Sequence, residues 1–477
     1  MSHLWTSQTM TTAMGGRPVG RLPEGVSGIS IDSRSLQPGD AFFAIKGDRF
    51  DGHDFATAAS AAGASLLVIA EGMLPALGRL ATPMIVVEDV LKAMEKLAAA
   101  ARARSAAKVI AVTGSAGKTT TKEVLRLVLS GSGRVHAADR SFNNHWGVPL
   151  TLARMPADCD FAVIEIGMNH AGEIRPLTRL ARPHLAIVTL IAPAHLGHFQ
   201  SLDEIARAKA EIFEGVVEDG FALINRDDQR WRVLDKQAKE AGIKQIVGFG
   251  EHSRAQIKLV KCTLAEDHSE IAVRIAGQEI RARVGAPGRH MVQNVLAALG
   301  AVHLVGADMD AATQALAGLR AVRGRGARHV LSHPEGAFTL IDESYNANPA
   351  SVKVALDLLA QTPVEGDGRR IAVLGDMREL GPHSAKLHAA LAKAIDAAGI
   401  DKVFLAGEEI KVLTGELPES LPVEYRPTTD ELGPLVVNDV RPGDALMVKA
   451  SLTLGFSRIV DALLNRFPAA AAQAGTQ

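Results

Sequence analysis

The fold is decided by Val112-Thr113-Gly114-Ser115-Ala116-Gly117-Lys118-Thr119-Thr120. This segment overlaps an apolar run, Val109 to Thr113, that predicts a buried strand, and it leads into a helix expected from about Lys118 to Ser130. Backbone N–H groups in such a glycine-rich turn point into a concavity, and the helix N-terminus adds partial positive charge. The strand–turn–helix order therefore predicts a phosphate-binding loop.

The side chains of this loop favour a nucleotide. A lysine at position 118 can neutralise β- and γ-phosphates, and a hydroxyl at position 119 can bind Mg²⁺. The strict P-loop pattern asks for a glycine where this chain has Val112, so only the shorter TGxxGKT form is present. A tight turn without a ligand is the alternative, and the strand–Gly–Lys–Thr–helix order disfavours it.

Further apolar strands follow along the chain, separated by helical segments. In the central region they are Phe161–Gly167, Leu185–Ile191 and Phe221–Asn225. After the basic, glycine-punctuated segment Arg320–Arg328 the alternation resumes with strands near Phe338–Asp342, Arg370–Leu374, Lys402–Ala406 and Ala445–Lys449. Alternating strands and helices, with strands apolar on both faces, are typical of a parallel, doubly wound α/β sheet.

We therefore predict three α/β domains. The central one, residues 108–325, carries a P-loop-type doubly wound parallel sheet, and a Rossmann-like C-terminal domain covers residues 326–477. Residues 1–107 predict a small α/β domain, with strands such as Ser65–Ala70 and Pro83–Glu88, and with Leu91–Ser105 as the connecting helix. A length of 477 residues agrees with about three domains of ~100–200 residues.

Composition excludes several classes of protein. The chain has 52 Lys+Arg against 53 Asp+Glu, a net charge of −1, which argues against a nucleic-acid binder. Two cysteines, Cys159 and Cys262, cannot build a disulfide framework and fit a reducing compartment. Apolar runs such as Leu66–Ala70 are too short for a membrane span, and the N-terminus carries no secretory signal. We expect a cytoplasmic protein without membrane insertion.

Candidate ligand-binding residues lie at and after the ends of the predicted central strands, where open α/β sheets bind their ligands. Glu165 ends an apolar strand, and an ionised carboxylate there needs a partner such as Mg²⁺, although a solvent-facing glutamate is an equal alternative. His195 and His198 lie just past the next strand. Lys209 lies in a helix that the capping-box pattern Ser201-Leu-Asp-Glu204 opens, and composition alone gives it no function.

Two polar loops follow strands of the third domain. Leu340-Ile-Asp-Glu-Ser-Tyr-Asn-Ala-Asn-Pro349 is dense in polar side chains, which favours a binding loop, although Asn346 and Asn348 are also good turn formers. Leu374-Gly-Asp-Met-Arg-Glu-Leu-Gly381 has the same layout after the next strand.

Together these motifs resemble the Mur ligases over nearly the whole chain. The resemblance is carried by Asp32-Ser-Arg34, Gly47–Phe55, the TGxxGKTTTKE loop, Asn143-Asn144, Gly147–Thr151, Glu165–Asn169, Pro193-Ala-His195, Ala206–Lys209, Asn294, Ser344–Pro349 and Leu374–Met377. The Ser-Tyr-Asn-Ala-Asn-Pro and Leu-Gly-Asp-Met segments, with the paired asparagines, resemble the member that adds a dipeptide.

The resemblance implies an ATP-dependent ligase that joins D-alanyl-D-alanine to UDP-N-acetylmuramoyl-tripeptide through an acyl phosphate, in peptidoglycan precursor synthesis. It implies ATP and two Mg²⁺ ions, with Thr119 and Glu165 holding one ion and Glu165 and His195 the second. The lysine matching Lys209 is often carbamylated in the family, which would make it an anionic metal ligand. Both substrates are small molecules, and a monomer is expected.

The resemblance also assigns the other site residues. The phosphates would lie on Gly114, Ser115, Ala116, Gly117, Lys118, Thr119 and Thr120, with Lys118 as the electrostatic clamp. Nucleotide contacts would come from Asn294, Arg325, Asp342, Tyr345 and Asn346. Ser33 and Arg34 resemble the uridine-diphosphate contacts, and Asn143 and Asn144 would face the peptidyl substrate.

Two positions depart from the family pattern. Glu343 stands where relatives commonly have aspartate, which leaves open whether it or Asp342 meets the ribose. The terminal strand continues as Lys449-Ala-Ser-Leu452, where the family usually has lysine–glycine–serine–arginine, so Leu452 brings no guanidinium. The resemblance leaves the third residue of the tripeptide open between lysine and diaminopimelate.

Three alternatives compete with this interpretation. A sister Mur ligase or a folylpolyglutamate-type ligase shares the loop, but the Asp-Asn-Pro-Arg type motif of the diaminopimelate-adding sister is absent from the sequence. A P-loop kinase or nucleotide switch would leave the polar loops of the third domain unexplained. A non-catalytic scaffold is disfavoured because Lys118, Thr119, Glu165 and His195 are all intact.

Overall fold

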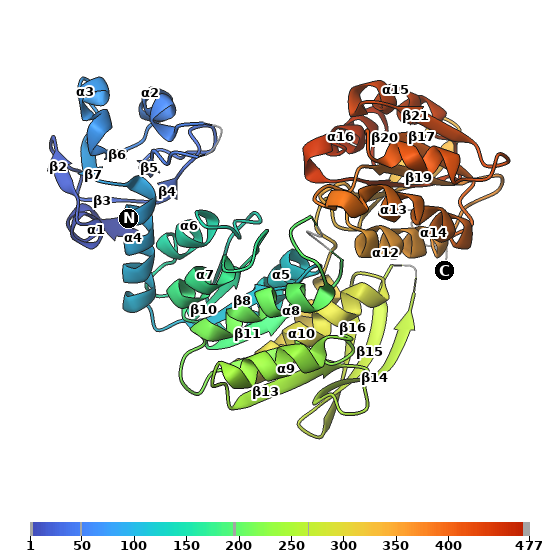
Figure 1. Ribbon diagram of the computed structural model, residues 1–477, viewed down its shortest axis with the longest axis horizontal. Coiled ribbons are helices and arrows are strands. Elements are labelled where there is room, and N and C mark those ends of the chain that lie inside the picture. Colours follow the sequence, from blue (N-terminus) through green and yellow to red (C-terminus); the bar gives the residue numbers. More distant parts are fainter. Residues whose placement is uncertain (1–2, 48–49, 194–196, 266, 471–477) are drawn as a thin grey trace.

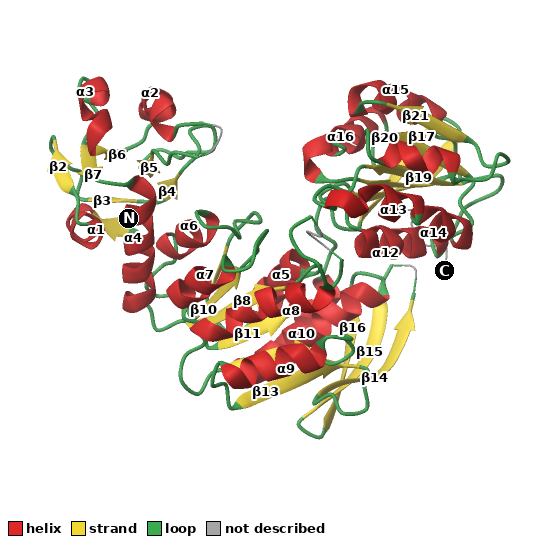
Figure 2. Ribbon diagram, viewed as in Figure 1, coloured by secondary structure: helices red, strands yellow, loops and turns green. Residues whose placement is uncertain are grey.

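The computed structural model describes residues 3–47, 50–193, 197–265 and 267–470. The molecule has three lobes, with the central lobe at the bottom of Figure 1 and the N-terminal and C-terminal lobes above it on either side. In the central and C-terminal lobes, strands form the middle layer and helices the outer layers (Figure 2). The described residues form four sheets, which confirms the predicted α/β class.

The N-terminal lobe is built on a five-stranded sheet in the order β2-β7-β6-β5-β4. Strand β2 is antiparallel to β7, and the remaining pairs are parallel. Its elements are β1 (Trp5–Thr6), α1 (Ser7–Met14), β2 (Arg17–Val19), β3 (Gly25–Val26), β4 (Ile29–Ser30), β5 (Ala41–Phe43), α2 (Ala56–Ala61), β6 (Leu66–Ala70), α3 (Leu74–Leu77) and β7 (Met84–Val87).

Helix α4 (Val90–Arg104) connects this lobe to the centre, as predicted. It begins where the Asp89 carboxylate accepts a hydrogen bond from the Lys92 N–H, a common helix N-cap. The N-terminal lobe also rests on α6 (Gly147–Ala153), because the Trp5 indole donates to the Ala153 carbonyl at 2.8 Å. The lobe is therefore fixed against the central domain as well as tethered to it.

The central lobe holds a nine-stranded sheet in the order β16-β15-β14-β13-β12-β11-β8-β10-β9. Every neighbouring pair from β9 to β14 in this order is parallel. The pairs β14–β15 and β15–β16 are antiparallel and form one edge of the sheet. The strands are β8 (Lys108–Thr113), β9 (Val135–Ala137), β10 (Phe161–Glu165), β11 (Leu185–Val188), β12 (Phe221–Asn225), β13 (Gln245–Gly250), β14 (Ile257–Leu264), β15 (Ser269–Ile275) and β16 (Gln278–Val284).

Helices cover both faces of this sheet. Helices α5 (Lys118–Leu129), α10 (Arg289–Val305) and α11 (Met309–Ala315) share a buried apolar cluster with one face. The opposite face packs on α6 and on α7 (Ile174–Ala181), α8 (Leu202–Ala210) and α9 (Trp231–Glu240). Since both faces are buried here, the strands β8, β10, β11 and β12 are continuous apolar runs, which is why these four were predicted from the sequence.

The strand order brings the candidate ligand-binding residues of the central domain to one edge of the sheet. From β8 the chain builds β9 and β10 on one side, and it then crosses to build β11, β12 and β13 on the other. Ligands in open α/β sheets bind beyond the carboxyl ends of the strands at such a switch point. Thr113 and Glu165 end β8 and β10, and Thr189 follows β11, so all three lie at this edge.

Residues 245–284 add four strands that the sequence analysis did not predict. Their burial explains the omission, because β14 and β16 alternate buried or half-buried with exposed residues and carry several charges. Such a pattern belongs to a sheet edge with one solvated face, whereas the apolar runs used above detect only fully buried strands.

The C-terminal lobe holds a six-stranded sheet in the order β17-β18-β22-β19-β20-β21. Strands β17 and β18 form an antiparallel hairpin, and the other pairs are parallel. Its elements are β17 (Ala327–His333), β18 (Gly336–Glu343), α12 (Pro349–Ala360), β19 (Arg370–Gly375), α13 (Ser384–Ala389), α14 (Leu391–Ala397), β20 (Lys402–Ala406), β21 (Val423–Arg426), α15 (Thr429–Asp439), β22 (Ala445–Lys449) and α16 (Ser457–Arg466).

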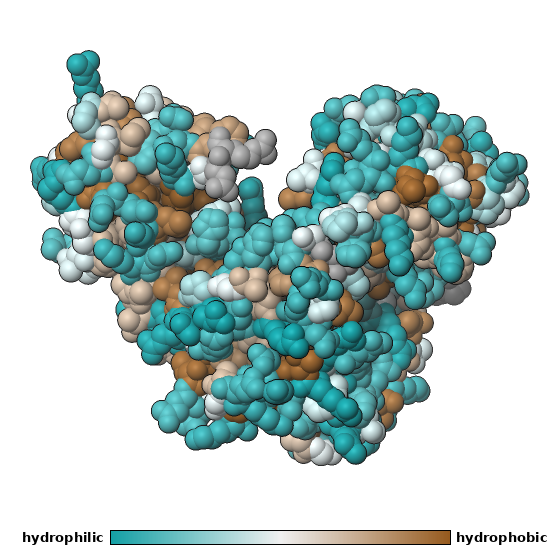
Figure 3. Space-filling model, in the orientation of Figure 1, coloured by the Kyte–Doolittle hydropathy of each residue, from teal (hydrophilic) through white to brown (hydrophobic). Residues whose placement is uncertain are grey.

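The surface is mostly hydrophilic on the face drawn in Figure 3, and it is hollowed between the N-terminal and C-terminal lobes. Within the described ranges, none of the helices combines the length and the apolar character that crossing a bilayer requires. The apolar residues gather instead in clusters beneath the helices of each lobe.

Candidate active site

The loop between β8 and α5 is shaped by two glycines with positive φ, Gly114 at 153° and Gly117 at 82°. A Cβ atom on Gly114 would overlap the Thr189 hydroxyl, and one on Gly117 would overlap the Asn294 amide oxygen. Glycine at both positions therefore lets the loop adopt these φ angles and leaves room for the Thr189 and Asn294 side chains to pack against it. Val112, at the place of the missing P-loop glycine, is a buried β8 residue in register with Glu165 of β10.

Thr189 and Leu190, just past β11, hold the loop from one side. The Thr189 hydroxyl lies 2.6 Å from the Ala116 carbonyl, and the Ser115 N–H donates to the Leu190 carbonyl at 2.7 Å. Asn225, at the end of β12, donates to the Thr189 carbonyl at 2.9 Å. The loop is thus preorganised by its neighbours before any ligand binds.

Lys118, the first residue of α5, lies over this loop. Its ammonium donates to the Gly114 carbonyl at 2.7 Å, closing the loop on itself. Burial lowers the pKa of Lys118, while Glu165 acts in the opposite direction and Arg325 lowers the pKa further. An anion bound in the loop would relieve the cost of burying this cation.

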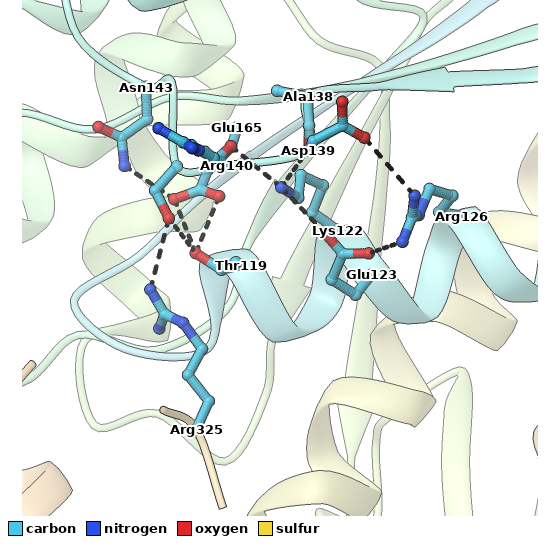
Figure 4. Close-up of polar contacts among 11 residues, drawn as sticks. Thr119, Lys122, Glu123, Arg126, Ala138, Asp139, Arg140, Asn143, Glu165 and Arg325 are labelled. Atoms are coloured by element: carbon cyan, nitrogen blue, oxygen red, sulfur yellow. Dashed lines mark hydrogen bonds and ion pairs between the residues drawn. The ribbon is translucent and has the colours of Figure 1, made fainter. Parts of the chain in front are cut away.

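Thr119 and Glu165 meet in front of the loop (Figure 4). The Thr119 hydroxyl lies 3.0 and 2.9 Å from the two carboxylate oxygens of Glu165, and the Asn143 amide donates to Glu165 at 2.7 Å. Glu165 is 2% exposed, so the solvent-facing alternative for its side chain is wrong. Ser141 lies beside the pair, with its hydroxyl 3.0 Å from that of Thr119.

The C-terminal lobe and the segment that leads into it supply the opposite wall. Arg325, just before β17, stacks on the Tyr345 ring at 4.1 Å and reaches the Ser141 hydroxyl at 3.5 Å. Lys449, at the end of β22, donates to the Glu343 carboxylate at 3.0 Å and to the Asn346 carbonyl at 2.9 Å. Charged groups from both lobes therefore face one space.

Asp342 and Glu343 point to different places. The Asp342 carboxylate is fully buried and accepts from the Gly324 N–H at 2.8 Å and from the Ser344 hydroxyl at 2.6 Å. Glu343 instead lines the space between the lobes. Of the two acids left open by the sequence, Asp342 fixes the backbone at the domain boundary and Glu343 faces the cavity.

The space between the lobes is a cavity of about 370 Å³. Most of the predicted nucleotide residues line it, together with several that the sequence analysis missed. The predicted ones are Ser115, Ala116, Gly117, Lys118, Thr119, Thr120, Asn143, Glu165, Asn294, Arg325, Tyr345 and Asn346, and the missed ones include Ser141, Phe249, His290, Gln293 and Lys449.

A strand-end rule could have found Lys449. It is the last residue of the otherwise apolar strand β22, just as Glu165 is the last residue of β10. Burial lowers the pKa of the His290 imidazole, against the opposing charge of Glu343. No local sequence signal marks Ser141 or Phe249, since each reaches the cavity through the fold.

Other predicted residues lie outside the cavity. Ser33 and Arg34 belong to the N-terminal lobe, where the Arg34 guanidinium binds the Asp32 carboxylate at 2.8 and 2.9 Å and lowers its pKa to about 2. The Asn144 side chain accepts from the Gly147 N–H at 2.9 Å, just as α6 begins. These contacts orient the loops on which the residues lie.

Lys209 is buried in α8 with 1% exposure. Among the described residues its ammonium has no hydrogen-bonding or ion-pairing partner, and burial and the charge of Lys118 hold its pKa well below the usual value. The predicted helix start is confirmed, because the Ser201 hydroxyl accepts from the Glu204 N–H. His195 lies outside the described residues, and the His198 ring packs on His170 at 4.1 Å.

Family comparisons cover all three lobes. Residues 25–102 match the Mur ligase family catalytic domain, residues 112–302 the Mur ligase middle domain, and residues 324–452 the Mur ligase glutamate ligase domain. The UDP-N-acetylmuramoyl-tripeptide--D-alanyl-D-alanine ligase of Escherichia coli is 38% identical over 80% of this chain and 81% of its own length. The chain belongs to the Mur ligase family.

Other relatives and structures cover this Mur ligase almost completely. The ligase of the same description from Rickettsia prowazekii is 31% identical over 96% of this chain and 99% of its own. The crystal structure of MurF from Acinetobacter baumannii has a TM-score of 0.82 at 29% identity, covering 97% of this chain and 99% of that one. MurF from Thermotoga maritima, solved with ADP, shares the fold with a TM-score of 0.75 at 24% identity, covering 92% and 97%.

Proposed function

We propose that this chain is an ATP-dependent ligase that joins D-alanyl-D-alanine to UDP-N-acetylmuramoyl-tripeptide in peptidoglycan precursor synthesis. The observation that carries the proposal is the cavity between the lobes, which brings a glycine-rich loop, a lysine and a buried carboxylate against charged groups of the C-terminal lobe. Similarity over nearly the full length to ligases of that description supports the substrates.

The reaction needs an activated carboxyl group. A peptide carboxylate attacks the γ-phosphorus of ATP, forming a C–O–P linkage and releasing ADP. The amine of D-alanyl-D-alanine then attacks the acyl carbon, loses a proton and expels phosphate, so that an amide bond replaces the acyl–oxygen bond. Catalysis of such phosphoryl transfer is mostly positioning and charge stabilisation, which the cavity can supply.

In this proposal the loop from Gly114 to Thr120 binds the ATP phosphates. Its glycines leave room for the Thr189 and Asn294 side chains that support the loop, and Lys118 lies over the loop as a cationic clamp. Asn294, Arg325, Tyr345 and Asn346 contact the nucleoside, and the charged Glu343, rather than Asp342, meets the ribose. The helix N-terminus of α5 adds favourable dipole charge for the phosphates.

The Thr119–Glu165 pair fits Mg²⁺. A hydroxyl and a carboxylate converge here within 3.0 Å, and oxygen donors beside a phosphate site are what Mg²⁺ prefers. Thr119 and Glu165 would hold one ion, and Glu165, His195 and Lys209 a second. When bound, these ions neutralise charge that develops on the transferring phosphoryl group.

Lys209 suits carbamylation by CO₂. Burial and the neighbouring Lys118 lower its pKa, which favours the neutral amine that attacks CO₂. The new N–C bond and the released proton turn the residue into an anion. That anion would remove the cost of an unpartnered buried ammonium and would bind a cation.

The three domains divide the substrates in this proposal. Residues 1–107 bind the UDP end through Ser33 and Arg34, residues 108–325 bind ATP, and residues 326–477 close on the nucleotide and bind the dipeptide. Asn143 and Asn144 face the peptidyl substrate. Leu452 is 56% exposed and brings no cation, so Lys449 and Arg325 supply the positive charge on this side of the cavity.

We also propose that the enzyme is a cytoplasmic monomer without nucleic-acid partners. The balanced charge of −1 gives no electrostatic footprint for a polyanion. Both cysteines are unpaired in the described structure, which suits a reducing compartment. ATP, which activates the carboxyl group, and the UDP-linked substrate are both small, water-soluble molecules.

The test is incubation of the protein with ATP, Mg²⁺, a UDP-N-acetylmuramoyl-tripeptide and D-alanyl-D-alanine, with the product mass measured. We expect ADP and phosphate to form only when both the carboxylate and the amine substrate are present. A tripeptide labelled with heavy oxygen in its carboxyl group should pass one labelled oxygen to the released phosphate. Unlabelled phosphate would contradict the acyl phosphate.

Another Mur-type or folylpolyglutamate-type ligase is the second candidate. The folylpolyglutamate synthase of Mycobacterium tuberculosis shares the fold alone, with a TM-score of 0.61 at 17% identity over 78% of this chain. A panel of amines separates these candidates. Faster ligation of a single amino acid, such as glutamate or diaminopimelate, than of D-alanyl-D-alanine would favour the second candidate. Tripeptides ending in lysine or diaminopimelate would define the carboxyl substrate.

A further inference from the structure

Lys122 is a fully buried lysine one turn into α5, and the proposed reaction does not use it. Its ammonium donates to the Ala138 carbonyl at 2.5 Å and to the Arg140 carbonyl at 3.2 Å, and it pairs with Glu123 at 3.1 Å (Figure 4). Two of the three donors of the ammonium are hydrogen-bonded to these carbonyls, and the Glu123 carboxylate balances its charge. A buried charge held in this way fixes the two carbonyls firmly in place.

The two carbonyls that Lys122 binds belong to the segment that follows β9. This strand lies at the edge of the central sheet, so the segment after it has a neighbouring strand on one side only. Residues 138–143 connect that edge to the cavity, where Ser141 and Asn143 lie. Lys122 is thus a tie between the helix that begins at the phosphate loop and the segment that lines the cavity.

Hydrogen bonds from this segment converge on Glu165. A carboxylate only accepts and a guanidinium only donates, which fixes the direction of the chain. Arg325 donates to the Ser141 hydroxyl, Ser141 donates to Thr119, and Thr119 donates to Glu165. Asn143 donates to the same carboxylate at 2.7 Å. The tied segment therefore connects the Thr119–Glu165 pair to the residue that precedes the C-terminal lobe.

We infer that Lys122 is a positioning residue for the metal site, acting through residues 138–143, which bring Ser141 to Thr119 and Asn143 to Glu165. This inference rests on the proposed function, in which Thr119 and Glu165 hold Mg²⁺. Groups that orient metal ligands typically change metal affinity by about 10–100-fold when they are removed. Lys122 is not among the residues that line the cavity, so we expect its effect to reach the site through residues 138–143.

The experiment measures ATP binding by calorimetry with Mg²⁺ and with a chelator. Lys122→Met keeps most of the apolar length and removes the ammonium. We expect the affinity for Mg²⁺·ATP to fall about tenfold or more and the affinity for metal-free ATP to stay unchanged. Ser141→Ala should also weaken the binding of Mg²⁺·ATP. The double variant should bind Mg²⁺·ATP no more weakly than the more affected single variant does, because both substitutions act through one segment.

Arg126→Met is the matched control. Arg126 pairs with Glu123 at 2.7 Å and with the exposed Asp139 carboxylate at 3.8 Å, on the outer side of the same network. Among the described residues, no hydrogen bond joins it to the 138 and 140 carbonyls that Lys122 holds. Its variant should bind Mg²⁺·ATP as the parent does. A loss as large as that of Lys122→Met would contradict a role specific to the buried ammonium.

Thr119→Ala separates this inference from the proposed function. If Thr119→Ala binds Mg²⁺·ATP as tightly as the parent does, the metal assignment itself fails. If Thr119→Ala weakens binding while a folded Lys122→Met binds like the parent, only the role of Lys122 fails. Should Lys122→Met not fold, Ser141→Ala decides, since an unchanged Mg²⁺·ATP affinity in that variant overturns the inference.

Discussion

Gly197, in the loop after β11, and Gly381, in the loop after β19, lie backbone against backbone across the boundary between the central and C-terminal lobes. A Cβ atom on Gly381 would lie 2.6 Å from the Gly197 Cα. The Gly197 N–H also donates to the carbonyl of Glu379 at 3.1 Å. Two residues without side chains thus allow the loops of the two lobes to dock directly against each other.

Gly381→Ala should therefore weaken the docking of the C-terminal lobe on the central lobe. The added methyl group would collide with the Gly197 backbone, so we expect the KM for ATP to rise about tenfold or more. Gly399→Ala is the matched control, because Gly399 has a similar φ, 59° against 55°, and open space around it. Both variants carry the same backbone strain, and equal KM values in the two would refute the docking effect.

Lys118→Ala should abolish ligation. The variant loses the cation that covers the phosphate loop, and removal of one such preorganised group typically costs about 100- to 1,000-fold in rate. The rate of phosphate release with both substrates present is the measurement. Lys244→Ala removes an exposed lysine and serves as the control. A Lys118→Ala rate within a few fold of the parent would exclude the clamp role.

The loop and most of the parallel strands were predicted from the sequence because their signals are local. Gly114, Gly117 and Lys118 lie within five residues, and each buried strand is an unbroken apolar run. Ser141 carries no such signal, because the fold alone brings it to the cavity. Lys449 does end an apolar run, but the run alone does not place it opposite the loop, because the cavity joins two sheets. The alternating strands β14–β16 were missed since one of their faces is solvated.

The roles of the paired acids after β18 separate by mutation. Glu343→Gln should raise the KM for ATP about tenfold, because a charged hydrogen bond near the nucleoside is worth about 1.5–3 kcal/mol. Asp342→Asn should instead lower the urea midpoint of unfolding, since it turns an acceptor of the Gly324 N–H and the Ser344 hydroxyl into a partial donor. The reverse pattern would assign the ribose to Asp342.

Lys209→Ala should lose activity that added bicarbonate cannot restore. The alanine variant has no amine to carbamylate, so we expect a loss of at least about 100-fold in ligation rate. The parent should slow in buffer stripped of CO₂ and recover with bicarbonate, and labelled bicarbonate should give a carbamate signal by NMR. Lys239→Ala, which removes a surface partner of Asp235, is the control. Full activity in Lys209→Ala would rule out the carbamate role.

His184 makes the stability of the central sheet depend on pH. Its Nδ1 accepts from the Val109 N–H at 2.9 Å, at the start of β8. Burial, together with the charges of Arg102, Lys108 and Arg182, lowers the pKa of this histidine from 6.5 to about 4. In the unfolded chain His184 takes up a proton as the pH falls below 6.5, whereas in the folded chain it stays neutral down to about 4.

The unfolded state therefore binds the extra proton between these two pKa values. Stability from His184 is complete above pH 6.5 and is lost as the pH falls towards about 4, by at most about 1.4 kcal/mol per pH unit. His184→Asn keeps an acceptor for the Val109 N–H and does not titrate. Urea unfolding from about pH 7 down to about pH 5 should show a smaller fall in the variant than in the parent, and parallel falls would exclude His184 as the cause.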